Sequence, residues 1–184
     1  MRQPLLALRM LASDLDRPAH QEVLVAVRNE VDWLAALVES VLGPASTDSP
    51  VATDFGALVA HATSVAFAGG QCRHVVTLLE PVRVQARGSS LERAVLCLLD
   101  NAIRAAGPTG TVELTLARRG RHAVLTVADD GPGVGNIPPQ HSLGLPTVRA
   151  VMADCGGGFS LGERAGGGAL AVLQVPVLTA ALAS

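Results

Sequence analysis

The chain has 184 residues, which allows one domain of ordinary size or a short helical module followed by one domain. Apolar residues make up 49% and aromatic residues 2%, so a core must be built from leucine, valine and alanine. The net charge of −2 argues against binding to nucleic acid or to a membrane surface. The apolar runs are shorter than the roughly 20 residues of a membrane span, and no signal-peptide pattern is visible. Three cysteines fit reduced thiols, so we expect a cytoplasmic protein without membrane contact.

The first 43 residues predict a helical hairpin. Leu5, Leu8 and Leu11 share one face of a helix over residues 4–14, and a second helix is expected from about Pro18, because proline is tolerated in a first helical turn. Apolar residues then recur at spacings of three and four: Val23, Val27, Val31, Leu34, Val38, Val41 and Leu42. So short a hairpin cannot bury both stripes alone. We therefore expect a homodimer through residues 1–43 that forms a four-helix bundle, with packing onto the rest of its own chain as the alternative.

Residues 44–52 are expected to be a linker, because the segment is rich in glycine, proline and serine. Hydrophobic periodicity and turn residues then predict a regular order of elements up to residue 177. Helices are expected over 53–67, with Asp54 near its start, from Leu91 to about Ala106, capped by Ser89 or Ser90, and over 145–155. Strands are expected at 74–79, 82–86, 111–117, 122–128, 159–163 and 169–177, and residues 129–142 are expected to form a loop. The expected fold class is α+β, in which the hairpin is followed over 53–184 by an α/β sandwich whose mixed sheet is covered by helices on one face.

One polar pair interrupts the apolar helix that is predicted to end near Ala106. Asp100 and Asn101 cost stability there unless they have partners. An asparagine oxygen that faces a cleft can ligate Mg²⁺, which prefers oxygen ligands. Arg104 follows three residues later on the same face and could reach a phosphate. On its own, Asn101 is equally well explained as a helix asparagine with satisfied hydrogen bonds.

A second polar segment, Asp129-Asp130-Gly131-Pro132-Gly133, ends a predicted strand. Glycines there allow a ligand to approach the backbone closely, and the Asp129 carboxylate can accept a hydrogen bond from an exocyclic amine such as that of adenine. Alone, the segment is an ordinary turn sequence. The functional prediction depends on the two segments occurring together, in this order, each on the expected element.

These residues resemble the catalytic ATPase domain of sensor histidine kinases, which belongs to the superfamily shared with gyrase, the heat-shock chaperone ATPase and the mismatch-repair ATPase. The resemblance runs from about Thr53 to Val177. It rests on four segments, which are Leu99–Ala102 as the N box, Asp129-x-Gly131-x-Gly133 as the first glycine box, Leu143-Gly144-Leu145 as the end of the second glycine box, and Gly166–Gly168 before a closing strand that ends at Val175-Pro176.

The resemblance implies that ATP and Mg²⁺ are the cofactors. It implies that Asn101 holds Mg²⁺, that Asp129 binds the adenine amino group and that Arg104 contacts the phosphates. Residues that would shape the nucleotide loops are Gly131, Gly133, Gly144 and Leu145. The chain departs from the family pattern at three places: Cys97 replaces the usual first asparagine of the N box, Ala105 replaces a frequent aromatic residue, and Gln140–Leu145 lacks part of the second glycine box. The loop between the boxes is short, so we expect modest nucleotide affinity.

The segment Arg2-Gln3-Pro4-Leu5 resembles the residues that directly follow the phosphoacceptor histidine in sensor kinases. In that alignment the histidine lies two positions before Met1. We therefore expect that this chain alone does not phosphorylate itself. His20, near the hairpin turn, is the alternative acceptor, although it lies in no comparable motif.

The leading prediction is a histidine protein kinase core of two-component signalling. It would bind ATP with Mg²⁺ and transfer the γ-phosphoryl group to a histidine, and then to the receiver domain of a response regulator. The alternative is a non-catalytic pseudokinase, or a dimeric protein that docks a response regulator. A serine kinase of the anti-sigma-factor type also has a short lid, but the N-terminal hairpin argues against it. No nucleic-acid partner is expected.

Overall fold

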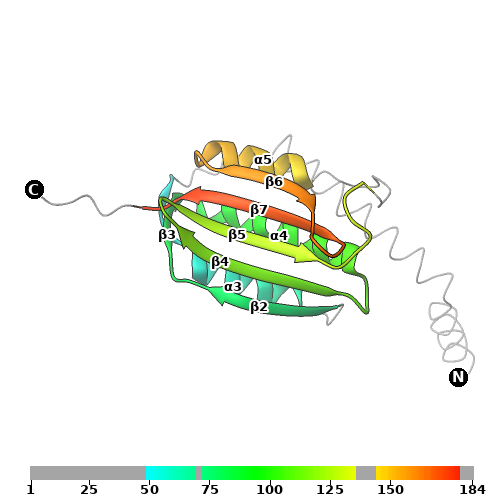
Figure 1. The fold of residues 1–184 in the computed structure, drawn as a ribbon. Coiled ribbons are helices and arrows are strands. Elements are labelled where there is room, and N and C mark those ends of the chain that lie inside the picture. Colours follow the sequence, from blue (N-terminus) through cyan, green and yellow to red (C-terminus); the bar gives the residue numbers. More distant parts are fainter. Residues whose placement is uncertain (1–48, 69–71, 136–143, 179–184) are drawn as a thin grey trace, which may run out of the picture. The chain divides into compact units, whose positions relative to one another are not determined.

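The computed structural model describes residues 49–68, 72–135 and 144–178 (Figure 1). The chain divides into two compact units, Met1–Gly43 and Pro44–Ser184, and every described residue belongs to the second. The helical hairpin predicted for residues 1–43 and the predicted linker up to residue 48 lie outside the described residues. The predictions for the hairpin, the dimer and His20 therefore remain predictions.

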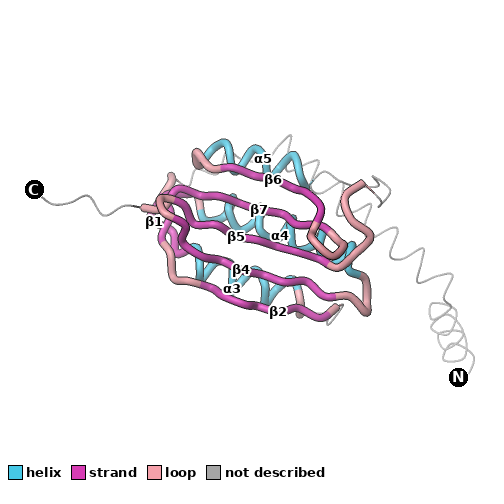
Figure 2. Tube along the Cα trace, viewed as in Figure 1, coloured by secondary structure: helices cyan, strands magenta, loops and turns pink. Residues whose placement is uncertain are grey.

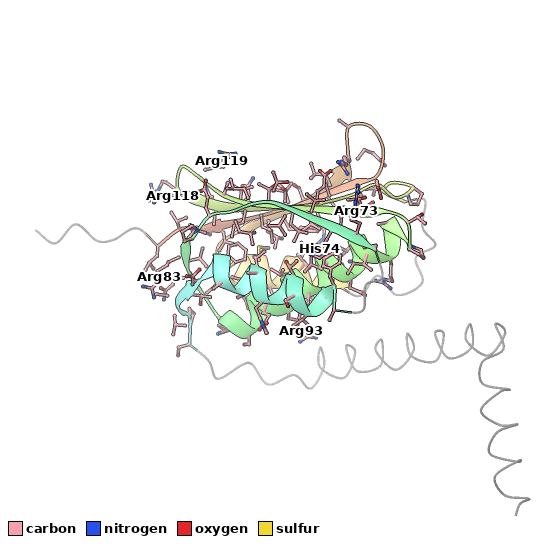
Figure 3. All side chains as sticks on the ribbon, turned by 90° about the horizontal axis from the view of Figure 1, so that it is seen from below. Arg73, His74, Arg83, Arg93, Arg118 and Arg119 are labelled. Carbon is pink, nitrogen blue, oxygen red and sulfur yellow. The ribbon has the colours of Figure 1, made fainter. Side chains whose placement is uncertain are left out.

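The second unit is a two-layer α/β structure (Figures 1 and 2). Its elements are β1 Val51–Asp54, α3 Phe55–Ala66, β2 Arg73–Leu79, β3 Arg83–Ala86, α4 Gly88–Ala106, β4 Thr111–Arg119, β5 His122–Asp129, α5 Gly144–Asp154, β6 Gly158–Glu163 and β7 Ala169–Pro176. The main sheet has five strands in the order β2-β4-β5-β7-β6. Strand β2 is parallel to β4 and the other neighbours are antiparallel. Helices α3, α4 and α5 cover one face of this sheet (Figure 3), which confirms the predicted mixed-sheet sandwich.

The core forms where the apolar faces of the helices meet the inner face of the sheet. Strands β4 and β5 alternate as predicted, with Val112, Leu114 and Leu116 of β4 fully buried. Helix α4 is the central helix and buries seven residues, namely Leu91, Ala94, Val95, Leu98, Leu99, Ala102 and Ile103. Because the buried face of α4 is fixed by packing in the core, the polar residues on the other side of this helix occupy defined positions.

A short strand that the sequence analysis missed precedes the first helix of the domain. Strand β1 pairs antiparallel with β3, with Val51 opposite Ala86 and Asp54 opposite Arg83, and together they form a separate two-stranded sheet. The composition of residues 44–52 predicts a linker, and the helix is predicted to begin at residue 53. Four residues are too few for a period-two pattern to stand out, and the partner strand lies about 30 residues further along the chain.

The helix starts follow local capping chemistry only in part. Asp54, which was expected near the start of this helix, is its N-cap residue, because its Oδ1 accepts a hydrogen bond from the Ala57 amide at 3.0 Å. The serine cap predicted for α4 is wrong. Helix α4 begins at Gly88, and its N-cap residue Arg87 makes no side-chain capping bond, so Ser89 and Ser90 lie inside the first turn. At the other end Gly107 adopts φ 68°, a conformation that glycine takes without strain.

The thiol of Cys155, just after α5, predicts a change of stability at alkaline pH. Burial raises its pKa above the ordinary value of 9.0 and the Asp154 carboxylate adds to this, while backbone hydrogen bonds at Gly157 and at Cys155 itself lower it. The thiol donates to the Met152 carbonyl oxygen at 3.4 Å, which requires its proton. The folded chain therefore holds this proton more tightly than the unfolded chain does.

The raised pKa of the Cys155 thiol stabilises the folded chain as long as the thiol is protonated. This stabilisation is complete below the unfolded pKa of about 9 and is lost as the pH rises through the folded pKa. We expect the free energy of unfolding, measured with urea between pH 8 and pH 10.5, to fall more steeply in the wild type than in Cys155→Ala. Parallel curves for the two proteins would contradict this expectation.

Candidate nucleotide site

The predicted site residues gather at the carboxyl end of α4. Gly131 lies so close to this helix end that a Cβ atom on it would be 2.5 Å from the carbonyl oxygen of Ala105. Gly144, the first residue of α5, lies against the helix one to two turns earlier. A Cβ atom there would be 3.3 Å from Cβ of Cys97 and 3.6 Å from Nδ2 of Asn101. The structure thus brings Asn101, Gly131 and Gly144 together, although they lie far apart in the sequence.

Asp129 is the buried carboxylate at this end of the sheet. It ends β5 and is 5% exposed. Its Oδ1 accepts hydrogen bonds from two backbone amides, those of Gly131 at 3.0 Å and Ala169 at 3.2 Å. Within the described ranges no donor reaches Oδ2. Oδ2 is not among the buried side-chain atoms that lack a partner in the described part of the chain, so it is accessible to a ligand that donates a hydrogen bond.

The turn between β6 and β7 holds the end of β5 in place. A Cβ atom on Gly168 would lie 1.9 Å from the Asp129 carbonyl oxygen, so only glycine fits there. Arg164 donates from Nη1 to the same carbonyl oxygen at 3.4 Å, and its Nη2 lies 2.9 Å from Glu113 Oε2 on β4. Together these contacts connect β4, β5 and the turn.

Glu163 supports the loop that follows Asp129. Its Oε1 accepts a hydrogen bond from the Val134 amide at 3.0 Å. Gly133, at φ 88°, leaves the space that Oε2 occupies, because a Cβ atom there would lie 2.6 Å from that oxygen. Asp130 is used elsewhere, since its Oδ1 accepts from the Thr111 amide at 2.8 Å. The loop is therefore fixed without the second oxygen of Asp129.

Sequence reasoning missed Glu163 and Arg164. The glycine run Gly166–Gly168 was recognised as part of the family pattern, but its contact with Asp129 spans about 40 residues of sequence. The signal that could have drawn attention to this turn is a pair of opposite charges separated by one alanine from three glycines.

Asn101 and Arg104 are in direct contact. Arg104 Nη2 donates to Asn101 Oδ1 at 2.7 Å and lies 3.0 Å from Asp100 Oδ2. Asn101 Nδ2 is buried and has no partner among the described residues. The oxygen predicted to bind Mg²⁺ is thus satisfied by Arg104, and the buried amide nitrogen lacks an acceptor. The contact of Arg104 with phosphates remains a prediction.

The donor set fits a magnesium nucleotide better than a metal held by the protein alone. In the part of the chain that the structure describes, no three His, Cys, Asp or Glu side chains converge on a common point. Mg²⁺ in nucleotide sites is commonly held by one or two protein oxygens together with phosphate oxygens and water. Asn101 Oδ1 can supply such an oxygen, and the unpartnered Nδ2 can donate to a phosphate oxygen.

A cavity of about 140 Å³ lies at the opposite end of α4. It is lined by Pro50, Gln85, Ala86, Arg87, Ser90, Val151, Asp154 and Cys155. None of the predicted site residues belongs to it. The polar groups that converge at Asp129 and Asn101, rather than this cavity, define the candidate site.

Comparison with known proteins identifies the class of domain. Residues 86–179 match the family described as histidine kinase-, DNA gyrase B-, and HSP90-like ATPase, and the chain belongs to this family. Among curated relatives, the sensor protein KdpD of Clostridium acetobutylicum is 22% identical over 211 residues, covering 96% of this chain and 23% of the relative. The signal transduction histidine-protein kinase/phosphatase MprB of Mycobacterium avium is 33% identical over 109 residues, covering 48% of this chain and 20% of the relative. The chain thus spans about a fifth to a quarter of the length of these relatives.

Solved structures agree with this class. A mycobacterial sensor histidine kinase MprB matches with a TM-score of 0.62 and 26% identity, over 71% of this chain and 99% of that chain. Full-length ShkA in complex with AMPPNP matches with a TM-score of 0.65 and 24% identity, over 90% of this chain and 40% of that chain. The described residues therefore form a catalytic ATP-binding domain of the sensor histidine kinase type. None of the described helices is both long and apolar enough to cross a membrane.

Proposed function

We propose that this chain is the cytoplasmic core of a sensor histidine kinase in two-component signalling. It binds ATP with Mg²⁺, and the γ-phosphoryl group passes to a histidine and then to the receiver domain of a response regulator. The observation that carries the proposal is the Asp129 carboxylate, buried and anchored through one oxygen, with the other oxygen free beside the carboxyl end of α4. The family match and the kinase named among the relatives support it.

Each residue of the site has a role that follows from its contacts. The free oxygen of Asp129 accepts a hydrogen bond from the adenine amine. Gly131 and Gly133 let the nucleotide approach the backbone. Gly144, which lies against Cys97 and Asn101, shapes the nucleotide loop together with Leu145, which packs against the core. Asn101 Oδ1 would hold Mg²⁺ if Arg104 gave up its hydrogen bond to this oxygen and kept its contact with Asp100 or took a phosphate oxygen instead.

Mg²⁺ in such a site neutralises the charge of the phosphates and orients the transferred group. The remaining contribution of the protein is positioning, because phosphoryl transfer needs little covalent chemistry from side chains. Cys97 and Ala105 remove an amide and a stacking surface that relatives of this type often have. We therefore infer an affinity for nucleotide that is modest.

Residues 1–43 are the proposed dimerisation module. The apolar stripe from Val23 to Leu42 needs a partner, and a second copy supplies one as a four-helix bundle. By the resemblance of Arg2-Gln3-Pro4-Leu5, the acceptor histidine would lie two positions before Met1.

The test of the phosphotransfer proposal compares two versions of the chain. One is residues 1–184, and the other carries His-Glu immediately before Met1. With ATP labelled at the γ-phosphate, we expect acid-labile label on the extended chain and none on the shorter chain, because only the extended chain holds a nucleophile with its neighbouring acidic group. Nucleotide binding without label on the extended chain would favour the non-catalytic docking protein. Label on the shorter chain that is lost in His20→Ala would move the acceptor to His20.

A further inference from the structure

Strand β2 is an edge of the main sheet, and its outer side presents backbone groups that no described strand pairs. It has one neighbour, β4, in the strand order of the described residues (Figure 2). The amides of Arg73 and Glu80 point toward β4, since they donate to the carbonyl oxygens of Gly110 and Leu116. Amides at alternate positions along β2 therefore face away from the sheet. A free edge of this kind is a template for another strand.

The side chains of β2 do little to protect this edge. Natural edge strands are commonly protected by charged residues or proline, and β2 has neither between His74 and Leu79. Val75, Val76 and Leu78 are exposed by 41%, 41% and 42%. The register shift around Thr77, between Val76 and Leu78, is the one irregularity of the strand. An added strand would therefore find apolar surface along the middle of β2.

These apolar side chains occur on both faces of the sheet. Val75 is paired with Glu113, whose side chain lies on the open face, whereas Val76 is paired with the fully buried Leu114 and so lies on the face covered by helices. A strand laid beside β2 would bury apolar side chains on both of its own faces. This favours a segment with a continuous apolar centre over one that alternates apolar and polar residues.

Exposed arginines lie at both ends of the edge. Figure 3 shows Arg73 at one end of β2, and Arg118, Arg119 and Arg83 at the other. At the first end, Asp130 accepts the amide of Thr111, the residue opposite Arg73. At the second end, Glu80 accepts the Arg118 amide and Asp54 is opposite Arg83, so three arginines stand against two carboxylates there.

We propose that the outer edge of β2 is a docking site for an extended segment of a partner protein that has an apolar centre and acidic ends. The segment joins the sheet as an additional strand next to β2. Main-chain hydrogen bonds supply affinity, the exposed valines and Leu78 select an apolar centre, and the arginines at both ends select acidic flanks. The proposal does not depend on nucleotide binding, because no residue of the Asp129 and Asn101 site contributes to it.

The test uses a fluorescein-labelled synthetic peptide, Glu-Glu-Val-Thr-Val-Val-Glu-Glu, and its analogue with lysine in place of each glutamate. Fluorescence anisotropy with the full chain in EDTA is expected to show at least tenfold tighter binding of the acidic peptide. N-methylation of alternate amides is expected to weaken binding tenfold or more on one edge of the peptide and less than twofold on the other. A strand pairs through one edge only, so a purely electrostatic contact would not show this difference.

Variants of the chain test the charges. Arg73→Glu combined with Arg119→Glu is expected to reverse the preference between the two peptides. Arg149→Glu, on α5 beside Phe159 of the opposite edge strand, is the control for a single charge reversal away from β2 and should leave the preference within twofold. Backbone amide shifts in NMR spectra should change along residues 73–79 and not along β6.

Several results would overturn the proposal. One is equal binding of the acidic and basic peptides to the wild type, or no binding of either at millimolar concentration. Another is binding to vesicles of anionic phospholipid that is tighter than binding to the acidic peptide and is lost on the same charge reversal, which would assign the surface to a membrane. A dimer of residues 44–184, seen by light scattering and removed by Val76→Asp, would show that the edge pairs with a second copy.

Discussion

Replacing Asp129 by asparagine is expected to weaken binding of adenine nucleotides by roughly 10- to 100-fold while the domain stays folded. The new side chain keeps an oxygen for the Gly131 and Ala169 amides, so the end of β5 remains anchored. Its NH₂ group then takes the place of the free carboxylate oxygen and faces the adenine amine, which is also a donor. Two buried donors without an acceptor cost about 1–3 kcal/mol, which sets this range.

The matched control is the neighbouring residue. Asp130→Asn changes the charge by the same amount and keeps an oxygen for the Thr111 amide. Calorimetric titration with ADP should therefore give an affinity within about twofold of the wild type for this variant. Equal losses in the two variants would show that net charge, and not the placement of one oxygen, governs binding.

Two glycines of the same turn should respond very differently to substitution by alanine. Gly166 and Gly168 have nearly the same φ angle, 93° and 92°. A Cβ atom on Gly166 meets nothing within 4 Å, whereas one on Gly168 would lie 1.9 Å from the Asp129 carbonyl oxygen. Gly166→Ala thus carries only the cost of a left-handed residue, about 1–2 kcal/mol. Gly168→Ala carries the same cost and in addition forces β5 and β7 apart.

Thermal unfolding measures the difference. Each kcal/mol of lost stability lowers Tm by about 4 °C in a domain of this size. We therefore expect the backbone strain in Gly166→Ala to lower Tm by that amount per kcal/mol, and Gly168→Ala to lower Tm at least twice as far as Gly166→Ala. Adenine nucleotide binding should survive the first substitution and be lost in the second, because the second moves Asp129 itself. Similar Tm values for the two variants would mean that the turn yields without displacing the carboxylate.

The sequence predicts the parts of the fold that depend on local periodicity. The alternation in β4 and β5 is long enough to define a hairpin, and the buried face of α4 follows its apolar spacing. The parts that escape prediction are those that depend on distant partners. Strand β1 is defined by β3, about 30 residues away, and the start of α4 at Gly88 follows no capping side chain.

The candidate site divides in the same way. Asn101, Asp129 and the glycines belong to contiguous motifs, so composition and resemblance single them out. The contacts that hold Asp129 in place come from Arg164, Gly168 and Ala169, and no local pattern links these residues to β5. The hydrogen bond between Arg104 and Asn101 could be predicted from their spacing of three residues on the helix.

The central claim is that the groups around Asn101 and Asp129 bind an adenine nucleotide together with Mg²⁺. Calorimetric titration of the chain with AMPPNP, in Mg²⁺ and in EDTA, tests it most directly. The account predicts saturable binding with a Kd below about 1 mM that is tighter in Mg²⁺, and loss of this Mg²⁺-dependent gain in Asn101→Ala, which still binds in EDTA. No heat at millimolar nucleotide from a chain that unfolds cooperatively would contradict it.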